Sequence, residues 1–358
     1  YLWLDDPFQN QPVADWARMY SQVFYANVAL ETLDKLGGSG GKEADNLRGT
    51  ALFLRSYAYH QLLQAFTLPY QKDGGNEALL GLVLKEISDI NAPARRSNLQ
   101  ESYNQVINDL QKAIELLPEN VLPKTRPTKA AALGLLARIQ LEMFDFQGAA
   151  ASTEKALQLY RDRLDFNRLN VALARPFQPF NEEMIFYSAL LTPGFMRSPE
   201  AIVNSEIMKA YEPGDLRKQA FFLDRGQNRF TFSKFLTGAV QFFGGISVGE
   251  LQLIAAEGNY RTGNEEKALK YLNELLESRY SKASFKPVLL KGKELLTRIL
   301  EERKKELIGR GIRWSDLRRL NQFQESRVTL EKTVDSQTYR LEPGSKKYSF
   351  PIPQEEMV

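Results

Sequence analysis

The sequence repeats one arrangement of helices with small residues at fixed positions. Ala137 precedes Ala149 by 12 residues, and Ala256 precedes Ala268 by the same 12 residues. Residues three and four positions apart lie on one face of a helix, and the second helix of each pair keeps a four-plus-three spacing. This spacing is seen in Val106, Leu110 and Ala113, in Ala149, Thr153 and Ala156, and in Ala268, Leu272 and Leu275. The pattern predicts antiparallel helix pairs that approach closely.

Helix pairs with this spacing are typical of tetratricopeptide hairpins, which stack so that each pair covers the apolar face of its neighbour. We predict a mainly α fold, a tetratricopeptide-like helical hairpin solenoid with irregular loop and short-strand insertions. The helical scaffold is expected at approximately residues 13–66, 98–160, 246–280 and 293–321. Variable insertions are expected at approximately residues 67–97, 160–245 and 322–358, within a single domain spanning 1–358.

Local signals predict several element boundaries. Asn98, with Glu101 three residues later, predicts a helix N-cap with a capping pair. Apolar β-formers in residues 183–189 predict a short strand inside the second insertion. Residues 332–353 are expected to be irregular, with an extended stretch where residues precede proline.

Composition narrows the classes of function. Lys and Arg total 47 and Asp and Glu total 44, so the formal net charge of +3 gives no field strong enough to indicate nucleic-acid binding. The chain has no cysteine and a single histidine, His60, so neither a disulfide nor a transition-metal site is expected. No cofactor is expected. His60 lies in an apolar helical run and is expected to be a hydrogen-bonded packing residue.

The sequence contains no apolar run that approaches the roughly 18–20 residues needed to span a bilayer. It begins at Tyr1, so an export signal or a lipid anchor would lie before it. The absence of either from these residues is not evidence against export.

The highly charged helical stretch 295–307 raises a question about function. Arg303 and Glu306 fall on or beside its apolar stripe, and a buried charge is costly unless a partner neutralises it. We interpret both as parts of an internal ion-pair network that fixes helix docking. A catalytic or ligand-binding role is the alternative, because perturbed charges also mark functional sites. The basic run 303–305 is expected on a solvated helix face.

Several segments together resemble one protein family. ERKKELIGRGIRWSDLRRL looks like the C-terminal signature of the SusD/RagB nutrient-binding outer-membrane lipoproteins of Bacteroidetes, and YSFPIPQEEM looks like their proline-containing terminus. The resemblance extends, in the family's order, to PTKAAALGLLARIQLEMFDFQGAA, NEEMIFYSA and YEPGDLRKQ, and to the first helix with its Asn27. Residues 249–253 depart from the usual charged helix start of the family.

The resemblance implies a cell-surface outer-membrane lipoprotein that binds a nutrient and acts as a lid on a SusC-like TonB-dependent transporter. It implies that the helical scaffold faces the transporter and that the insertions build the ligand site. The signature motifs are scaffold in this family, so no binding residue is carried over from them. The expected partners are a glycan or oligosaccharide ligand and the transporter, with no nucleic acid.

Aromatic residues in the irregular segments are the candidates for ligand binding. Sugar rings present apolar C–H faces that pack on flat aromatic side chains, and polar side chains bond their hydroxyl groups. The candidates are Trp3, Tyr70, Phe177, Phe180, Phe195, Phe242 and Phe243, with Asn181 and Arg197 as polar partners. For each of them a place in the core is the favoured alternative.

Two other binding functions stay open. The chain could be a tetratricopeptide protein–protein interaction module, or a SusD-like binder of a peptide or another non-glycan nutrient. An enzyme is not expected, and no catalytic residue or metal ligand is assigned. Adjacent acidic pairs such as Glu301 and Glu302 point apart in a helix, whereas glycoside hydrolysis needs facing carboxylates. No Ser/His/Asp set is visible around the only histidine.

Overall fold

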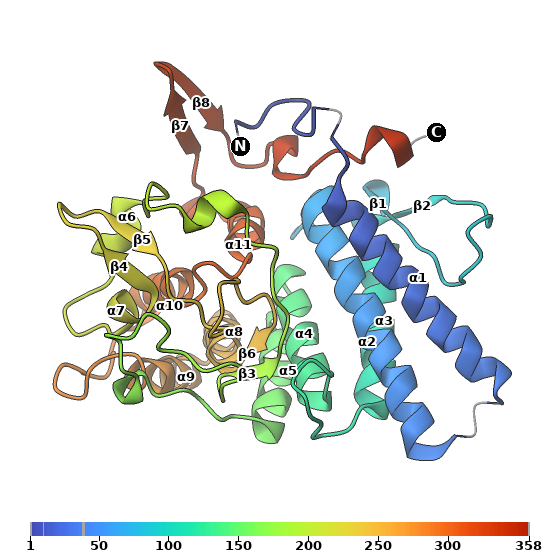
Figure 1. The fold of residues 1–358 in the computed structure, drawn as a ribbon, viewed down its shortest axis with the longest axis horizontal. Helices are drawn as coiled ribbons and strands as arrows, with labels where there is room; N and C mark the ends of the chain where they lie inside the picture. Colours follow the sequence, from blue (N-terminus) through green and yellow to red (C-terminus); the bar gives the residue numbers. More distant parts are fainter. Residues whose placement is uncertain (1, 10, 38–39, 357–358) are drawn as a thin grey trace. The chain divides into compact units, whose positions relative to one another are not determined.

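The computed structural model describes residues 2–9, 11–37 and 40–356. Helices dominate the fold, and the described strands form short antiparallel pairs (Figure 1), which confirms the predicted mainly α fold. The residues pack into two compact units. One comprises Tyr1–Pro118, Glu142–Phe144 and Trp314–Val358, and the other comprises Glu119–Leu141 and Asp145–Arg313. The assignment of both units to one domain stays a prediction.

The first unit is built on three long helices, α1 (Ala14–Lys35), α2 (Gly41–Phe66) and α3 (Leu99–Leu116). α2 packs against both α1 and α3. At the start of α3, the Asn98 side chain accepts a hydrogen bond from the backbone N–H of Glu101, and the Glu101 carboxylate accepts one from the backbone N–H of Asn98. This reciprocal pair is the predicted capping box, so the N-terminus of α3 follows from local sequence.

A buried polar cluster joins these three helices. Arg55 of α2 donates to the two carboxylate oxygens of Asp109 of α3 at 2.7 and 2.8 Å, and to Asn27 Oδ1 of α1 at 2.8 Å. The bidentate geometry fixes the spacing of the helices. His60 is also buried, and its Nε2 lies 2.8 Å from Glu142 Oε2. This confirms the predicted role of His60 as a hydrogen-bonded packing residue.

The strands of the first unit form two antiparallel pairs, β1 (Leu80–Val83) with β2 (Arg96–Asn98), and β7 (Leu330–Val334) with β8 (Gln337–Leu341). The prediction that residues 332–353 are irregular is therefore wrong for their first part. Asp335 and Ser336 form the β7–β8 turn with φ angles of 48° and 65°. Two-residue hairpin turns of this type favour Asn-Gly or Asp-Gly. The Asp-Ser sequence lacks this signal, so the turn was not predicted.

Shorter helical elements complete the first unit. From Trp314 onward, α11 (Arg313–Leu320) belongs to it. The remaining elements are single 3₁₀ turns: η1 (Asn76–Ala78), η4 (Gln324–Ser326), η5 (Lys346–Tyr348) and η6 (Gln354–Glu356).

The second unit is built on helical hairpins: α4 (Lys129–Glu142) with α5 (Phe146–Leu159), and α8 (Val248–Arg261) with α9 (Glu265–Glu277), followed by α10 (Gly292–Glu306). α8 contacts α5, α9 and α10. The small residues of the repeat lie in the core, and those fully buried include Ala137, Ala149, Ala256 and Ala268. A Cβ added to Gly134 would lie 2.7 Å from Ile246 Cγ2, so the close approach of α4 requires glycine there.

The insertion between α5 and α8 consists of short elements. They are η2 (Phe166–Arg168), β3 (Met184–Phe186), η3 (Gly194–Arg197), α6 (Ser205–Lys209), α7 (Arg217–Phe221), β4 (Phe222–Asp224) and β5 (Phe230–Phe232), and β6 (Ile246–Ser247) leads into α8. β3 pairs with β6, and β4 pairs with β5. β3 lies within residues 183–189 and confirms the predicted strand. Much of the aromatic content of the insertion forms its own core, with Phe166, Phe221 and Phe222 buried together.

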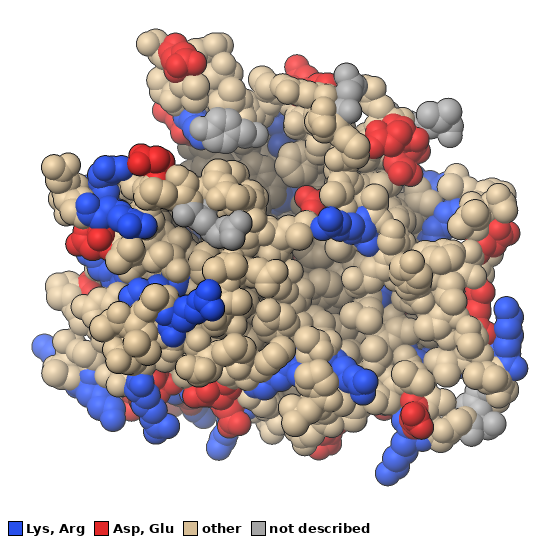
Figure 2. Space-filling view, in the orientation of Figure 1, with Lys and Arg blue, Asp and Glu red and all other residues tan. Residues whose placement is uncertain are grey.

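Acidic and basic side chains are interspersed over the face shown in Figure 2, without a large patch of one sign. This agrees with the small net charge of +3. None of the described helices is long and apolar enough to cross a membrane.

Candidate functional site

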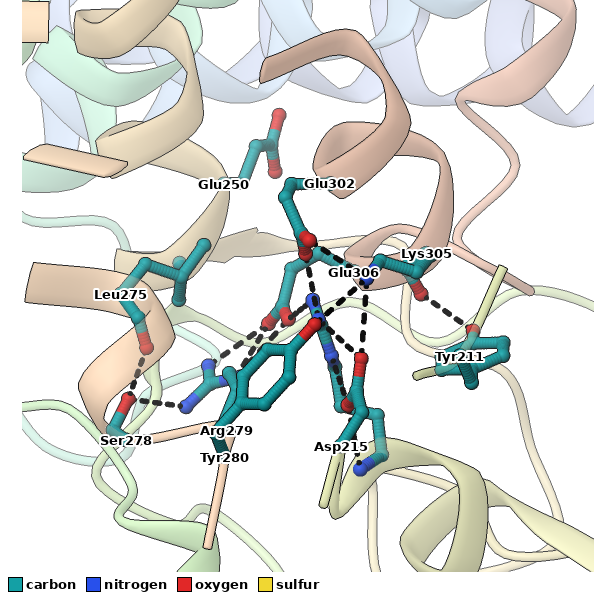
Figure 3. Close-up of polar contacts among 12 residues, drawn as sticks. Tyr211, Asp215, Glu250, Leu275, Ser278, Arg279, Tyr280, Glu302, Lys305 and Glu306 are labelled. Atoms are coloured by element: carbon teal, nitrogen blue, oxygen red, sulfur yellow. Dashed lines mark hydrogen bonds and ion pairs between the residues drawn. The ribbon is translucent and has the colours of Figure 1, made fainter. Parts of the chain in front are cut away.

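A group of charged side chains surrounds the last two turns of α10 (Figure 3). Leu295 and Ile299 bury one face of this helix, and Glu302 and Glu306, one and two turns further along, continue that face inward. Glu302 and Lys305 are only 0% and 2% exposed. α10 therefore carries charges into the core, where each needs a partner of opposite sign.

The insertion supplies partners for these charges. Arg217, at the start of α7, contacts Glu302 Oε2 at 2.6 Å and Asp215 Oδ2 at 2.7 Å. Lys305 Nζ contacts Glu302 Oε1 at 2.6 Å and Asp215 Oδ2 at 3.2 Å. The segment that carries Asp215 and Arg217 is therefore held against α10 by ion pairs to which each side contributes both an acidic and a basic side chain.

Arg279, two residues after α9, extends the network to β3. Its guanidinium donates to Glu306 Oε1 at 2.8 Å and lies 3.1 Å from Glu183 Oε1. Glu183 also accepts hydrogen bonds from the backbone N–H groups of Leu164 and Gly249 at 3.0 and 2.7 Å. A Cβ on Gly249 would lie 2.9 Å from the carboxylates of Glu183 and Glu306. Glycine at this departure from the family pattern leaves room for the network.

The burial of α10 confirms one prediction and corrects another. Arg303 and Glu306 are both buried, and Glu306 belongs to an internal ion-pair network as predicted. Arg303 and Lys305 are only 3% and 2% exposed, so the prediction that residues 303–305 form a solvated face is wrong. The physical reason is the insertion: its Tyr211 hydroxyl donates to the Lys305 backbone carbonyl at 2.9 Å, and its Asp215 pairs with the Lys305 ammonium.

For two carboxyl groups of this network, Asp215 and Glu306, the neighbouring cations outweigh the effect of burial on the pKa. Burial of Asp215 raises the pKa of its carboxyl, but Arg217 and Lys305 lower it further, so the pKa lies below its ordinary value. For Glu306, Arg279 and Arg217 likewise overcome burial and lower the pKa. A general acid at neutral pH needs a raised pKa. The network therefore fits a scaffold and not an acid–base centre.

A second buried cluster joins α4, α8 and the segment after α10. Arg138 contacts the two oxygens of Glu250 at 2.6 and 2.8 Å, and Arg310 contacts Glu250 Oε2 at 3.1 Å. Arg310 also donates to the backbone carbonyl of Phe243 at 2.9 Å. Sequence reasoning missed Arg138, Glu250 and Arg310. A signal was available for Arg138, which lies between Ala137 and an isoleucine in an apolar run.

The cavity beside these clusters is too small for a sugar. Its lining includes Phe235, Phe242, Phe243, Glu183, Arg279 and Glu306. Its volume is about 20 Å³, which holds about one water molecule.

The structure buries four of the predicted site residues. Phe177, Phe242 and Phe243 are 1%, 7% and 2% exposed, so these three rings are core residues, the alternative that the sequence favoured for each candidate. They fill the core of the insertion, where Phe177 packs against Phe221. Asn181 is also buried, and its side-chain amide donates to the backbone carbonyls of Gln178 and Leu236 at 2.9 Å each.

The other predicted site residues are divided between the two units. In the first unit, Trp3 is partly buried against the cluster around Leu317. Tyr70, also in the first unit, donates its hydroxyl to Gln100 Oε1 at 2.6 Å. In the second unit, Phe180 and Phe195 are 44% and 67% exposed. The side chain of Arg197 lies outside the described part of the structure.

Two family models match the sequence. One, described as starch-binding associating with outer membrane, matches residues 3–141, and the SusD family model matches residues 248–358. SusD-like protein P2 of Formosa agariphila is 28% identical over 142 residues, which are 39% of this chain and 26% of that protein. The match thus takes in about a quarter of that relative's length.

Solved structures agree with the fold over nearly the whole chain. A SusD superfamily protein from Bacteroides vulgatus gives a TM-score of 0.81 at 22% identity and covers 100% of this chain and 85% of its own. A SusD-like carbohydrate binding protein from the same species gives 0.72 at 22% identity, covering 96% and 82%. A laminarin binding SusD-like protein gives 0.65 at 18% identity, covering 97% and 84%.

These identities establish the fold alone, whereas the two family models match both ends of the sequence and together cover more than half of it. The matches, the shared fold and the motifs around α10 agree with one another, and the chain belongs to the SusD/RagB family.

Proposed function

We propose that this protein binds a nutrient glycan at the cell surface and delivers it, without catalysis, to a SusC-like TonB-dependent outer-membrane transporter. The observation that carries the proposal is the shared fold with SusD-like proteins whose names state carbohydrate or laminarin binding. The description of the matching family model, starch-binding associating with outer membrane, supports the ligand class and the location. A lipid anchor outside this sequence would hold the protein at the outer membrane.

The buried carboxylates support a binding protein over a glycoside hydrolase. Hydrolysis of a glycosidic bond needs two carboxyl groups that face an open site and differ in protonation. Glu250, Glu302 and Glu306 each lie in an ion pair with arginine inside the second unit. These carboxylates are buried and paired with arginine side chains, so they are not exposed to a substrate.

The exposed aromatic candidates favour the insertion of the second unit as the ligand-binding region. Phe180 and Phe195 both lie in this insertion and keep much of their surface exposed. Trp3 and Tyr70 are the corresponding candidates in the first unit. Binding residues lie disproportionately on irregular segments held by a rigid scaffold, so the insertion is where ligand specificity would reside.

Native affinity electrophoresis tests glycan binding directly. The protein runs in gels that contain laminarin, soluble starch or alginate, beside a protein with no affinity for polysaccharides. Retardation by at least one polysaccharide, reproduced by calorimetric titration with the matching oligosaccharide, is the expected result. No binding in any gel would contradict the glycan ligand and favour a peptide or another nutrient. Release of reducing sugar during incubation would contradict the non-catalytic role.

Co-purification tests delivery to a transporter. The full-length lipoprotein carries an affinity tag and is expressed with the TonB-dependent barrel encoded beside it. Recovery of the barrel from detergent-solubilised outer membranes is expected. Recovery of other proteins without the barrel would favour a general tetratricopeptide interaction module.

A further inference from the structure

Phe180 is an exposed aromatic residue in an unfavourable backbone conformation. Its φ angle is 53°, in the left-handed region that bulky L residues rarely adopt. The ring is 44% exposed, so burial offsets little of that cost. Strained residues of this kind persist where the surrounding structure imposes them, and they cluster at functional sites.

The backbone on both sides of Phe180 is held in place. Asn181 is anchored through its buried side-chain amide, and its backbone carbonyl accepts a hydrogen bond from Lys124 Nζ at 2.9 Å. On the other side, Gly238 approaches so closely that a Cβ there would lie 2.7 Å from the backbone nitrogen of Pro179. These contacts fix the direction in which the Phe180 ring leaves the surface.

The ring of Phe180 is backed by other aromatic rings. Its centroid lies 4.9 Å from that of Tyr187, just after β3, and Tyr187 lies 6.3 Å from Phe243. The guanidinium of Arg310 lies 4.3 Å from the Phe243 ring. The exposed ring is therefore connected by packing to the buried cluster of Arg310 and Glu250, which gives it a rigid support.

Polar groups of both signs lie beside this ring pair. Lys124 Nζ donates to the Tyr160 hydroxyl at 2.9 Å as well as to the Asn181 carbonyl. The Tyr160 hydroxyl in turn donates to the backbone carbonyl of Glu182 at 2.8 Å, so the exposed Glu182 lies close to Lys124. An ammonium group has three donors, so a third N–H remains beyond these two bonds to described residues. The Tyr187 hydroxyl has no hydrogen-bond partner among the residues that the structure describes.

We propose that Phe180 and Tyr187 form a stacking platform for a pyranose ring of a neutral oligosaccharide, with Lys124 and Glu182 as hydrogen-bond partners at its rim. This inference rests on the proposed function and names the site and the ligand class. Sugar hydroxyl groups donate and accept, so they suit a rim that contains an ammonium and a carboxylate. A polyanionic glycan would meet the Glu182 carboxylate as a like charge.

Substitutions of Phe180 test the platform. Calorimetric titrations use laminarin-derived and starch-derived oligosaccharides as neutral probes and alginate oligosaccharides as the anionic probe. The parent protein is expected to bind a neutral probe more tightly than the anionic one. Phe180→Ala is expected to weaken that binding about tenfold or more, as for a central aromatic contact. Phe180→Leu keeps an apolar side chain without a flat face and is expected to weaken it nearly as much.

Two further variants sharpen the result. Leu223→Ala removes an exposed apolar side chain from β4 of the same insertion and is expected to leave affinity within about twofold. Tyr187→Phe removes only the hydroxyl and is expected to weaken binding by about two- to tenfold, the range of one hydrogen bond. Circular dichroism and thermal unfolding verify that each variant is folded.

The outcomes separate this inference from the proposed function. Neutral-glycan binding that survives both Phe180 substitutions overturns the platform and leaves the proposed function in place. Tighter binding of alginate than of the neutral probes overturns the ligand class. No binding of any probe by the parent protein contradicts both proposals.

Discussion

The buried network around α10 and the surface around Phe180 lie in the same unit, but the network fixes its side chains whereas the surface fixes only the backbone. In the network each side chain is fixed by several partners of opposite charge, as for Glu302 between Arg217 and Lys305. At the surface, the backbone beside Phe180 is fixed while its ring stays open to solvent. The difference indicates that stability resides in the network and that the surface keeps an unfavourable conformation.

The largest loss of stability is expected from Glu302→Gln. The substitution removes a negative charge that lies between two buried cations, Arg217 and Lys305. Breaking a buried ion pair by removing one partner costs about 3–5 kcal/mol. Urea-induced unfolding followed by far-ultraviolet circular dichroism, which reports on the helices of both units, measures the free energy of unfolding.

Glu301→Gln is the matched control, because Glu301 is the preceding residue of α10 and is exposed. We expect that variant to lose less than about 0.5 kcal/mol. Equal losses of unfolding free energy in the two variants would show that the burial of Glu302 does not increase its contribution to stability.

Acid is expected to weaken the network and to lower the free energy of unfolding. The pKa of Asp215 and of Glu306 lies below its ordinary value in the folded protein. Hydrogen bonding to Arg298 lowers the pKa of Glu212 to about 2. A carboxyl with a lowered folded-state pKa stabilises the protein above its unfolded pKa, about 4, and loses this contribution as the pH falls through the folded-state pKa. The loss is therefore expected between about pH 4 and pH 2.

Urea unfolding at about pH 7, 4, 3 and 2 measures this loss. Glu212→Gln removes one of the titrating groups, and its stability should fall less steeply over the same range. A free energy of unfolding that stays constant over this whole acid range would contradict the lowered pKa values.

The difference between local and long-range contacts explains which features the sequence could predict. The helix pairs, the capping box of Asn98 and the strand β3 depend on neighbouring residues, so periodicity and local hydrogen bonding were sufficient. The pairing of Glu302 with Arg217 is different, because Arg217 lies 85 residues away in the chain and no local pattern connects the two. The motifs indicated that this region is scaffold, and only the folded chain shows which charges meet.

The aromatic candidates show the same limit. Phe177, Phe180 and Phe243 all lie in segments without helical period, and residue type alone does not separate a core ring from a surface ring. The structure buries Phe177 and Phe243 and exposes Phe180. Tyr187 and Lys124 were not predicted at all, since they join Phe180 through contacts between separate segments.

A comparison of Phe180→Gly with Phe180→Ala measures the strain at the surface. At most positions glycine is less stable than alanine, because it loses more backbone freedom on folding. At a φ angle of 53° the order should reverse, since glycine adopts this region without a steric penalty. We expect Phe180→Gly to be more stable than Phe180→Ala by about 1 kcal/mol. The usual order, with alanine more stable, would contradict a strained Phe180.

The smallest loss of stability is expected from Glu331→Gln in the β7–β8 hairpin of the first unit. Glu331 pairs with Arg340 at 2.7 Å, nearly the 2.6 Å that separates Glu302 from Arg217, but these hairpin side chains are 50% and 63% exposed. Exposed pairs contribute about 0–1 kcal/mol because water screens them and the side chains lose freedom. Urea unfolding should therefore show a loss below about 1 kcal/mol. Because the two distances are almost equal, a loss as large as that of Glu302→Gln would mean that burial does not set the strength of these ion pairs.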